Sequence, residues 1–305
     1  MRFTKGLLYK MKVTVFTPTY NRAYIISKLY MSLQRQQVKD FEWIIIDDGS
    51  NDNTESLVKG WITLEKGFPI RYYKQKNGGK CRAINRALDL AQGELFFTVD
   101  SDDYLTDDAI KKIIGWEADI HDKTGFCGIA GNLGTTPHDT PNSIIEAKYF
   151  EGTALDRYRN IDGERAMVFY TDIHRRYKYP EFEGENFITE AVAWNRMAND
   201  GYKIRFYNDI IWVYEYREDG LTKAGNKLFI NNPRGYGLWL HEKAKFEHES
   251  LLQKLKMIYT FTCDLAPNYN TNVIAECISA PRFLIMIIDF GQKIYHSVKG
   301  KYQKS

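Results

Sequence analysis

Short apolar runs alternate with helical patterns over the first third of the chain. Helical periodicity fits residues 24–36, 54–64 and 80–90, and one such segment follows each of the first three apolar runs. Four runs have the β-branched and aromatic character of buried strands: residues 12–16, 41–47, 70–74 and 95–99. This order of strand, helix and strand predicts an α/β fold with a parallel sheet.

Polar and glycine residues follow each predicted strand directly. In chain order, these loops are TPTYNR, DDGSNDN, QKNGGK and DSDD. In open parallel sheets, ligands bind beyond the carboxyl ends of the strands, because the loops converge there and helix N-termini face the crevice. We therefore expect one ligand site built from these four loops.

Three carboxylates stand close together after the fourth strand, at Asp100, Asp102 and Asp103. Their mutual repulsion makes folding costly unless a cation compensates it. Mg²⁺ and Mn²⁺ take oxygen ligands, often one or two protein carboxylates together with phosphate oxygens. The cluster predicts Asp102 as a metal ligand, with Asp100 next to a ribose or behind the metal. The alternative is that these acids only decorate the turn before the next helix.

The loops after the second and third strands offer further ligand contacts. Asp48 can accept hydrogen bonds from a nucleobase or a sugar, and its alternative role is an Asx turn before Gly49. Asn77 and Lys80 flank a Gly-Gly pair that permits close backbone approach and opens a helix whose N-terminus attracts anions. The motifs GxxxxGK[ST] and GxGxxG do not occur at these strand ends, which argues against P-loop, nicotinamide and flavin enzymes.

The loop after the first strand supplies a wall and a charged rim for the same pocket. Tyr20 can stack or form a hydrogen bond, and Arg22 contributes positive charge. Pro18 belongs to this wall, although its alternative role is simply to form the turn.

The regular alternation breaks down beyond about residue 130, where strand and helix patterns mix. From residue 223 onward the pattern is mostly helical. We therefore expect an α/β domain at residues 1–222, with a regular half at residues 12–125 and a mixed half at residues 126–222, and a helical extension at residues 223–305.

Composition narrows the classes of protein that need to be considered. The chain has 305 residues, 44% of them hydrophobic and 27% charged, which excludes disordered and fibrous classes. Its formal net charge of +3 is too balanced to indicate a nucleic-acid partner. The four cysteines form no CxxC pair, so neither a disulfide framework nor a structural zinc is indicated. The sequence has no apolar run of about eighteen residues, the length that a membrane-spanning helix needs. We therefore expect a cytoplasmic protein.

The last predicted helix combines an apolar face with basic residues. The segment PRFLIMIIDFGQKIYHSVKGKYQK includes Lys299, Lys301 and Lys304. Such a pattern suits peripheral contact with the inner face of the cell membrane. A buried closing helix with a polar tail is the alternative.

The segments TPTYNR, IIIDDGSNDNT, NGGKCRAINRAL and FFTVDSDD, in this order, resemble glycosyltransferase family 2. The resemblance covers residues 12–110. It implies a GT-A fold, which is Rossmann-like with a mostly parallel central sheet flanked by helices. It also implies an inverting transfer from a nucleotide sugar, often a UDP-sugar. Residues 1–222 would then be the catalytic domain, with residues 12–125 as the nucleotide-sugar-binding half and residues 126–222 as the acceptor half. Asp48 would lie near the base, Asp100 near the ribose, and Asp102, at the end of a DxD motif, on Mn²⁺ or Mg²⁺. A glycan or lipid-linked hydroxyl would receive the sugar in synthesis of a bacterial-type surface polysaccharide.

Members of this family usually place a general base in the second half, as a Glu-Asp pair at the start of a helix. That pair is missing here. Glu190 precedes the helical run AVAW, whereas Glu183 and Glu185 lie in the preceding turn, so the resemblance favours Glu190 as the base. The expected donor-binding set contains nine residues: Thr17, Pro18, Tyr20, Arg22, Asp48, Asn77, Lys80, Asp100 and Ser101.

Two other functions compete with glycosyl transfer. A nucleotidyltransferase or another metal-dependent phosphate enzyme could use the same acids, but the loop TPTYNR supplies neither a Gly-Arg-rich segment nor an Asp nucleophile. A non-catalytic module that binds a nucleotide or carbohydrate remains open because the acidic pair is missing.

Overall fold

The computed structural model describes residues 11–215, 217 and 225–302, and the side chains of these residues up to 294. Two compact units divide the chain. The first contains the described residues up to Tyr179 together with Arg196–Arg217, and the second contains Pro180–Asn195 together with the described residues from 225 onward. Residues 180–195 thus belong with the C-terminal helices, and the predicted domain boundary at residue 222 stays a prediction.

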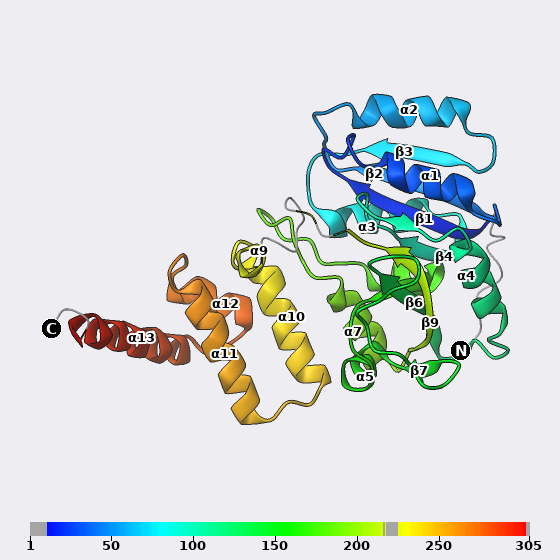
Figure 1. Ribbon diagram of the computed structural model, residues 1–305. Helices are drawn as coiled ribbons and strands as arrows, with labels where there is room; N and C mark the ends of the chain where they lie inside the picture. The colour runs from blue at the N-terminus through cyan, green and yellow to red at the C-terminus, as the bar shows by residue number, and fades with distance from the viewer. Residues whose placement is uncertain (1–10, 216, 218–224, 303–305) are drawn as a thin grey trace. The chain divides into compact units, whose positions relative to one another are not determined.

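A nine-stranded mixed sheet forms the centre of the first unit (Figure 1). Its strand order is β3-β2-β1-β4-β8-β6-β9-β5, with β7 beside β9. The strands are β1 Met11–Thr19, β2 Phe41–Asp47, β3 Ile70–Lys74, β4 Gly93–Thr98, β5 Tyr104–Leu105, β6 Phe126–Gly134, β7 Phe150–Gly152, β8 Arg165–Tyr170 and β9 Lys203–Val213. The pairs β1–β2, β1–β4 and β2–β3 are parallel, as the sequence predicts. Antiparallel β8 then joins β4 to β6.

Helices cover both faces of this sheet. Within the first unit they are α1 Ser27–Arg35, α2 Thr54–Leu64, α3 Lys80–Leu90, α4 Ala109–Ala118, α5 Ala154–Asn160, α6 Thr171–His174 and the 3₁₀ helix η1 Arg175–Tyr177. Helices α1, α2 and α4 share one core cluster with β2, where Tyr30 and Trp61 stack on Trp43. Helix α3 packs against β1 and β2. The sequence predicts α2 and α3 at their observed bounds. Helix α1 begins three residues later than expected because Ile25 and Ile26 donate to Arg22 O in a turn.

The second unit is helical, as the sequence predicts. Its helices are α9 Asn226–Ile230, α10 Pro233–Phe246, α11 Leu251–Leu265, α12 Thr271–Ile278 and α13 Arg282–Tyr302, and α7 Ala191–Asn199 starts in this unit and ends in the first. A separate core cluster holds α10 to α13 together through Phe261, Leu265, Ile274 and Ile285. Over the part of the chain that the structure describes, every helix is too short or too polar to cross a membrane.

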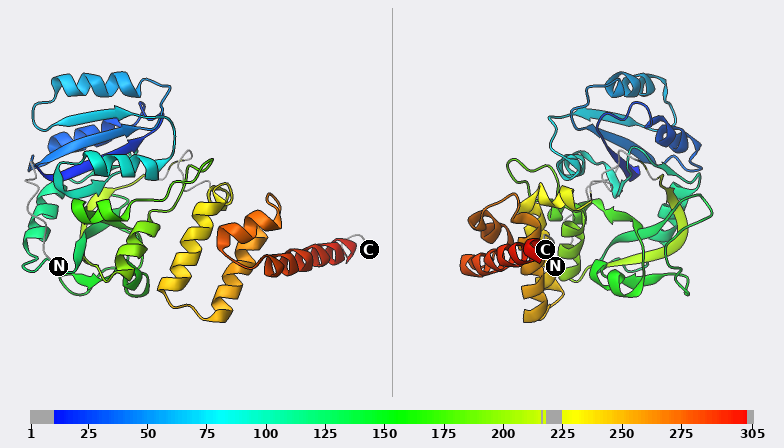
Figure 2. Two further views of the ribbon diagram at one scale, coloured as in Figure 1. Left: turned by 180° about the vertical axis from the view of Figure 1, so that it is seen from behind. Right: turned by 60° about the vertical axis from the view of Figure 1, so that its left-hand side comes forward.

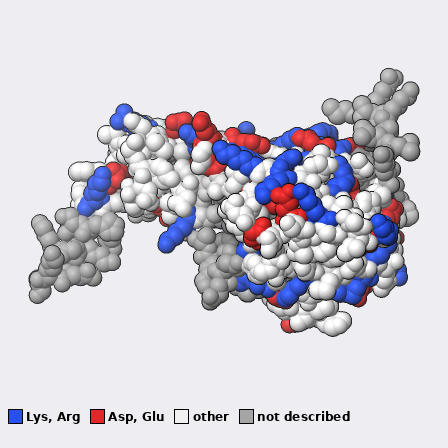
Figure 3. Space-filling view, turned by 90° about the horizontal axis from the view of Figure 1, so that it is seen from above, with Lys and Arg blue, Asp and Glu red and all other residues white. Residues whose placement is uncertain are grey.

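Charges of both signs are mixed on the surface of the first unit. Figure 3 shows Lys and Arg side chains lying among Asp and Glu side chains on the face that it presents. This distribution agrees with the small net charge of the sequence, +3.

His174 is a buried titratable group in the first unit. Its imidazole is surrounded by the rings of Phe96, Phe169 and Tyr179. Neither ring nitrogen has a hydrogen-bond partner. Burial lowers the pKa of His174 to about 3, so the ring of the folded protein stays neutral around pH 6.5, where an exposed histidine gains its proton.

We expect His174 to make the protein sensitive to acid. Its contribution to stability is fully present above a pH of about 6.5 and declines as the pH falls toward 3, because the unfolded chain binds a proton there and the folded one does not. The contribution of His174 to the free energy of unfolding then falls by up to about 1.4 kcal/mol per pH unit. Denaturant unfolding between pH 7 and pH 5 should show a shallower decline for His174→Leu. The exposed His121 serves as control, and His121→Leu should follow the wild type. Equal slopes for His174→Leu and wild type would contradict this account.

Candidate active site

Asp48 ties together the end of β1 and the loops that follow β2 and β3. Its carboxylate accepts hydrogen bonds from the backbone N–H groups of Gly78 (3.0 Å) and Gly79 (2.7 Å) and from Gln75 Nε2 (2.8 Å). Its own N–H donates to Thr19 O (2.8 Å). Gly79 has φ 89°, a left-handed conformation that favours glycine, and directly precedes α3. Asp48 thereby fixes the backbone from which Lys80 extends.

Lys80 connects this loop to the acidic cluster after β4. Its Nζ lies 2.7 Å from Asp100 Oδ1. The ion pair is only partly exposed, so water screens it less than a surface pair. Through Asp48, Lys80 and Asp100, the structure brings the loops after the four parallel strands to one edge of the sheet.

Asp102 lies half-buried among charged groups of both signs. Burial raises the pKa of its carboxyl, and the charge of Asp100 raises it further. The guanidinium groups of Arg22 and Arg217 act in the opposite direction and lower the pKa. The ionised carboxylate is therefore disfavoured here and would gain from an additional cation.

Asp103 points into the sheet and anchors the acidic loop. Its Oδ2 accepts a hydrogen bond from Trp212 Nε1 (2.7 Å) in β9. Burial, followed by the charge of Asp100, raises the pKa of Asp103 to about 7. This aspartate thus couples the DSDD loop to the last long strand of the sheet.

Arg217 is a site residue that the sequence reasoning missed. Arg217 forms an ion pair with Glu215, with 3.0 Å between a guanidinium nitrogen and a carboxylate oxygen. Lys28 forms a second ion pair with the same carboxylate, at 2.6 Å. The hydrogen bond from Lys28 is the main cause of a lowered pKa at Glu215, so this carboxylate stays charged beside Arg217. Because β9 runs parallel to β6, and two antiparallel pairings relate β6 to β4, the chain after β9 emerges at the same edge as the acidic loop. The charged residues Glu215 and Arg217, which follow within four residues of the end of β9, were the available signal.

The other expected donor-binding residues differ in accessibility. Tyr20 is exposed after β1, and Asn77 is exposed in the loop after β3, so both side chains can reach a ligand. Pro18 is half-buried at the end of β1, and Ser101 is buried within the acidic loop. Thr17 is fully buried, and its hydroxyl accepts a hydrogen bond from Trp43 Nε1 (2.9 Å). The Thr17 side chain therefore belongs to the core beneath the strand end.

The three glutamates considered as the general base lie in the second unit. Glu185 accepts hydrogen bonds from the N–H groups of Arg234 (2.8 Å) and Gly235 (2.9 Å) in the first turn of α10. Its carboxylate thus satisfies two of the N–H groups that a helix start leaves unpaired. Glu183 is exposed. Glu190 is half-buried directly before α7, where its carbonyl accepts from Trp194 N.

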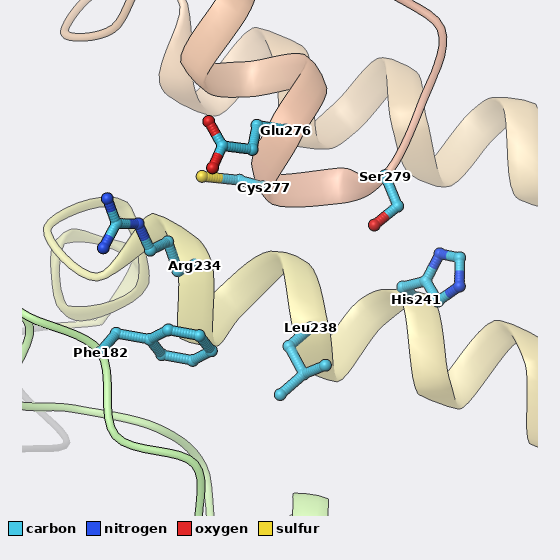
Figure 4. A pocket seen from close by; sticks show the side chains of 7 residues that line it. All are labelled: Phe182, Arg234, Leu238, His241, Glu276, Cys277 and Ser279. Atoms are coloured by element: carbon cyan, nitrogen blue, oxygen red, sulfur yellow. The ribbon is translucent and has the colours of Figure 1, made fainter.

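Among the described residues, no group of three or more His, Cys, Asp or Glu side chains is arranged to hold a metal ion by itself. The second unit also contains a small open cavity of about 220 Å³ (Figure 4), and none of the expected site residues lines it. Its lining consists of Phe182, Arg234, Leu238, His241, Glu276, Cys277 and Ser279.

The α/β sheet, with four loops converging at the carboxyl ends of its parallel strands, is of the GT-A type, and comparison with known proteins agrees. The model of the family described as glycosyl transferase family 2 matches residues 14–179, more than half of the chain. The chain belongs to this family and is a glycosyltransferase, as its motifs predicted.

Relatives include enzymes of several bacteria. The chain is 27% identical to the GalNAc(5)-diNAcBac-PP-undecaprenol beta-1,3-glucosyltransferase of Campylobacter jejuni, over 91% of this chain and 93% of that protein. It is 32% identical to the glycosyltransferase GlyA of Streptococcus pneumoniae and 34% identical to the chondroitin synthase of Pasteurella multocida, over 72% of this chain in both cases. It spans only 33% and 20% of those two longer proteins.

Solved structures confirm the fold. Residues 1–349 of Staphylococcus aureus TarS, crystallised with UDP-GlcNAc, align with a TM-score of 0.61 at 17% identity, over 93% of this chain and 92% of that one. The mannosyltransferase PcManGT of Pyrobaculum calidifontis, in complex with GDP-Man and Mn²⁺, aligns with a TM-score of 0.55 at 18% identity, over 94% and 81%. At these identities, the similarity demonstrates a shared GT-A fold.

Proposed function

We propose that this glycosyltransferase moves a sugar from a UDP-sugar to a hydroxyl of a glycan or lipid-linked acceptor, with inversion, in synthesis of a bacterial-type surface polysaccharide. The observation that carries the proposal is the chain of contacts from Asp48 through Gly79 and Lys80 to Asp100, with Asp102 beside it. The C. jejuni relative is named for a lipid-linked acceptor, and TarS was crystallised with a UDP-sugar.

Charges at the sheet edge suit a nucleoside diphosphate. Arg22 and Arg217 act electrostatically on Asp102, so their positive charge lies where a diphosphate would meet the acidic loop. Lys80 adds a further cation and is held in place by Asp100. Asp100 would meet the ribose, and the loop that Asp48 fixes would lie against the base.

The oxygen ligands available at Asp102 fit a hard divalent cation. Burial and the neighbouring charge of Asp100 make the ionised carboxylate of Asp102 costly, and a bound cation would offset this cost. One or two carboxylates with diphosphate oxygens are a common environment for Mg²⁺ or Mn²⁺, so a larger protein cluster is not needed. When bound, the ion would supply Lewis-acid stabilisation to the departing diphosphate.

The chain's own residues would perform the remaining steps. Glu190 would take the proton from the acceptor hydroxyl as its oxygen forms a bond to the anomeric carbon. The bond from that carbon to the diphosphate breaks on the opposite face, which inverts the configuration. Arg22, Arg217 and Lys80 would stabilise the negative charge that grows on the leaving diphosphate.

A panel of sugar nucleotides tests this function. We expect one UDP-sugar to raise the unfolding temperature in the presence of Mn²⁺ and to release UDP slowly, with chelation by EDTA removing both effects. Binding without release of UDP from any sugar nucleotide would favour a non-catalytic module. Release of pyrophosphate from a nucleoside triphosphate and a sugar phosphate would instead indicate a nucleotidyltransferase.

A further inference from the structure

Helix α13 carries large apolar side chains on two opposite faces. One face packs within the second unit, where Ile285 is fully buried and Gln292 contacts Cys263 of α11. The other face presents side chains that are between 48% and 67% exposed: Phe283, Met286, Ile287, Phe290 and Ile294. Figure 2 shows α13, coloured red, from two sides.

These exposed side chains form a single stripe. Their spacings of three, four, seven and eleven residues from Phe283 place them on one side of an α-helix. A solvated helix normally turns polar residues outward, and a contiguous exposed apolar patch marks a surface that another body covers. We call these five residues the outer stripe of α13. Their exposure indicates that another molecule or a membrane covers them.

Charge identifies the kind of occupant. Residues 282–305 contain five Lys and Arg against one acid, Asp289, so with His296 neutral the segment carries +4. Anionic lipid headgroups attract such a segment, whereas a second copy of the helix would bring the same positive charge against it. The helix is too polar to span a bilayer, so an apolar stripe with basic flanks suits a position in the plane of the membrane interface.

We propose that the outer stripe of α13 docks on an anionic membrane surface. The apolar side chains would enter the boundary between headgroups and acyl chains, and the net positive charge of residues 282–305 would attract anionic headgroups. This inference goes beyond the proposed function and rests on it only for its biological purpose, since such docking would bring the enzyme to a lipid-linked acceptor.

Vesicle co-sedimentation of the full chain tests the proposal. We expect binding to vesicles of phosphatidylcholine mixed with phosphatidylglycerol, and much weaker binding to phosphatidylcholine alone. The double variant Ile287→Glu/Phe290→Glu should reduce binding about tenfold or more, because it places two charges in the stripe. The matched control Ile62→Glu/Leu64→Glu changes two exposed apolar side chains of α2 and should bind like the wild type.

The outcomes separate this proposal from the enzymatic one. Release of UDP from the donor without vesicles should be the same in wild type and both double variants. Failure of the wild type to bind anionic vesicles, equal binding to neutral ones, or equal losses in both double variants would each overturn the proposal. If Ile287→Glu/Phe290→Glu instead abolishes a concentration-dependent dimer while vesicle binding is absent, the stripe pairs two copies of the chain and the membrane proposal is wrong.

Discussion

Replacing Asp102 by asparagine is expected to lower sugar transfer by about a thousandfold, the effect of removing a group that stabilises charge in the transition state. The substitution keeps the size of the side chain and removes the charge that would hold the divalent cation. Steady-state release of UDP from the donor at saturating Mn²⁺ is the measurement.

The same substitution should not destabilise the metal-free protein. Burial and the charge of Asp100 raise the pKa of Asp102, so ionising this carboxyl costs more free energy in the folded protein than in the unfolded chain. We expect the unfolding temperature of Asp102→Asn without metal to equal or exceed that of the wild type. Addition of Mn²⁺ with UDP should raise the unfolding temperature of the wild type and leave that of the variant unchanged.

Asp107→Asn is the matched control for this prediction. Asp107 is exposed in the following turn and forms a surface ion pair with Arg35 at 2.9 Å. Such a pair contributes little, so turnover and stability should stay close to wild type. Full activity of Asp102→Asn would remove Asp102 from the metal site, and an equal loss in both variants would indicate a general effect of charge.

Glu190→Gln is expected to lower turnover by roughly 10²- to 10⁴-fold, the range for loss of a general base. Glutamine keeps the size and polarity of the side chain but cannot accept the hydroxyl proton. Donor affinity should be unchanged, because the proposed donor contacts lie on other residues. Calorimetric titration with UDP and Mn²⁺, beside steady-state kinetics, distinguishes the two effects.

Glu185→Gln is the control, because the structure gives Glu185 a different role. Its carboxylate accepts from two N–H groups at the start of α10, and a neutral amide offers only one oxygen. We expect a stability loss of about 1–2 kcal/mol and near-normal turnover of the folded protein. A loss of turnover confined to Glu185→Gln would show that the base has been misassigned.

Local pattern was enough to predict the nucleotide-binding half of the fold. Strands β2 and β3 and helices α2 and α3 occupy the residues that periodicity indicates, because each buries one run of apolar side chains. Parallel pairing then follows from the alternation of strands and helices, and with it the shared edge where Asp48, Lys80 and Asp100 meet.

Tertiary structure alone decided which groups support that edge. The sequence does not reveal that β5, which directly follows the acidic loop, pairs with the end of β9, and this pairing brings the chain after β9, with Arg217, to Asp102. Nor does it show that Asp48 bonds the backbone of Gly78 and Gly79, that Asp103 bonds Trp212, or that Glu185 caps α10. Hydrophobic periodicity is a local property and specifies the elements. These contacts depend on strand order and on hydrogen bonds between distant segments, which form only once the sheet and the helices have assembled.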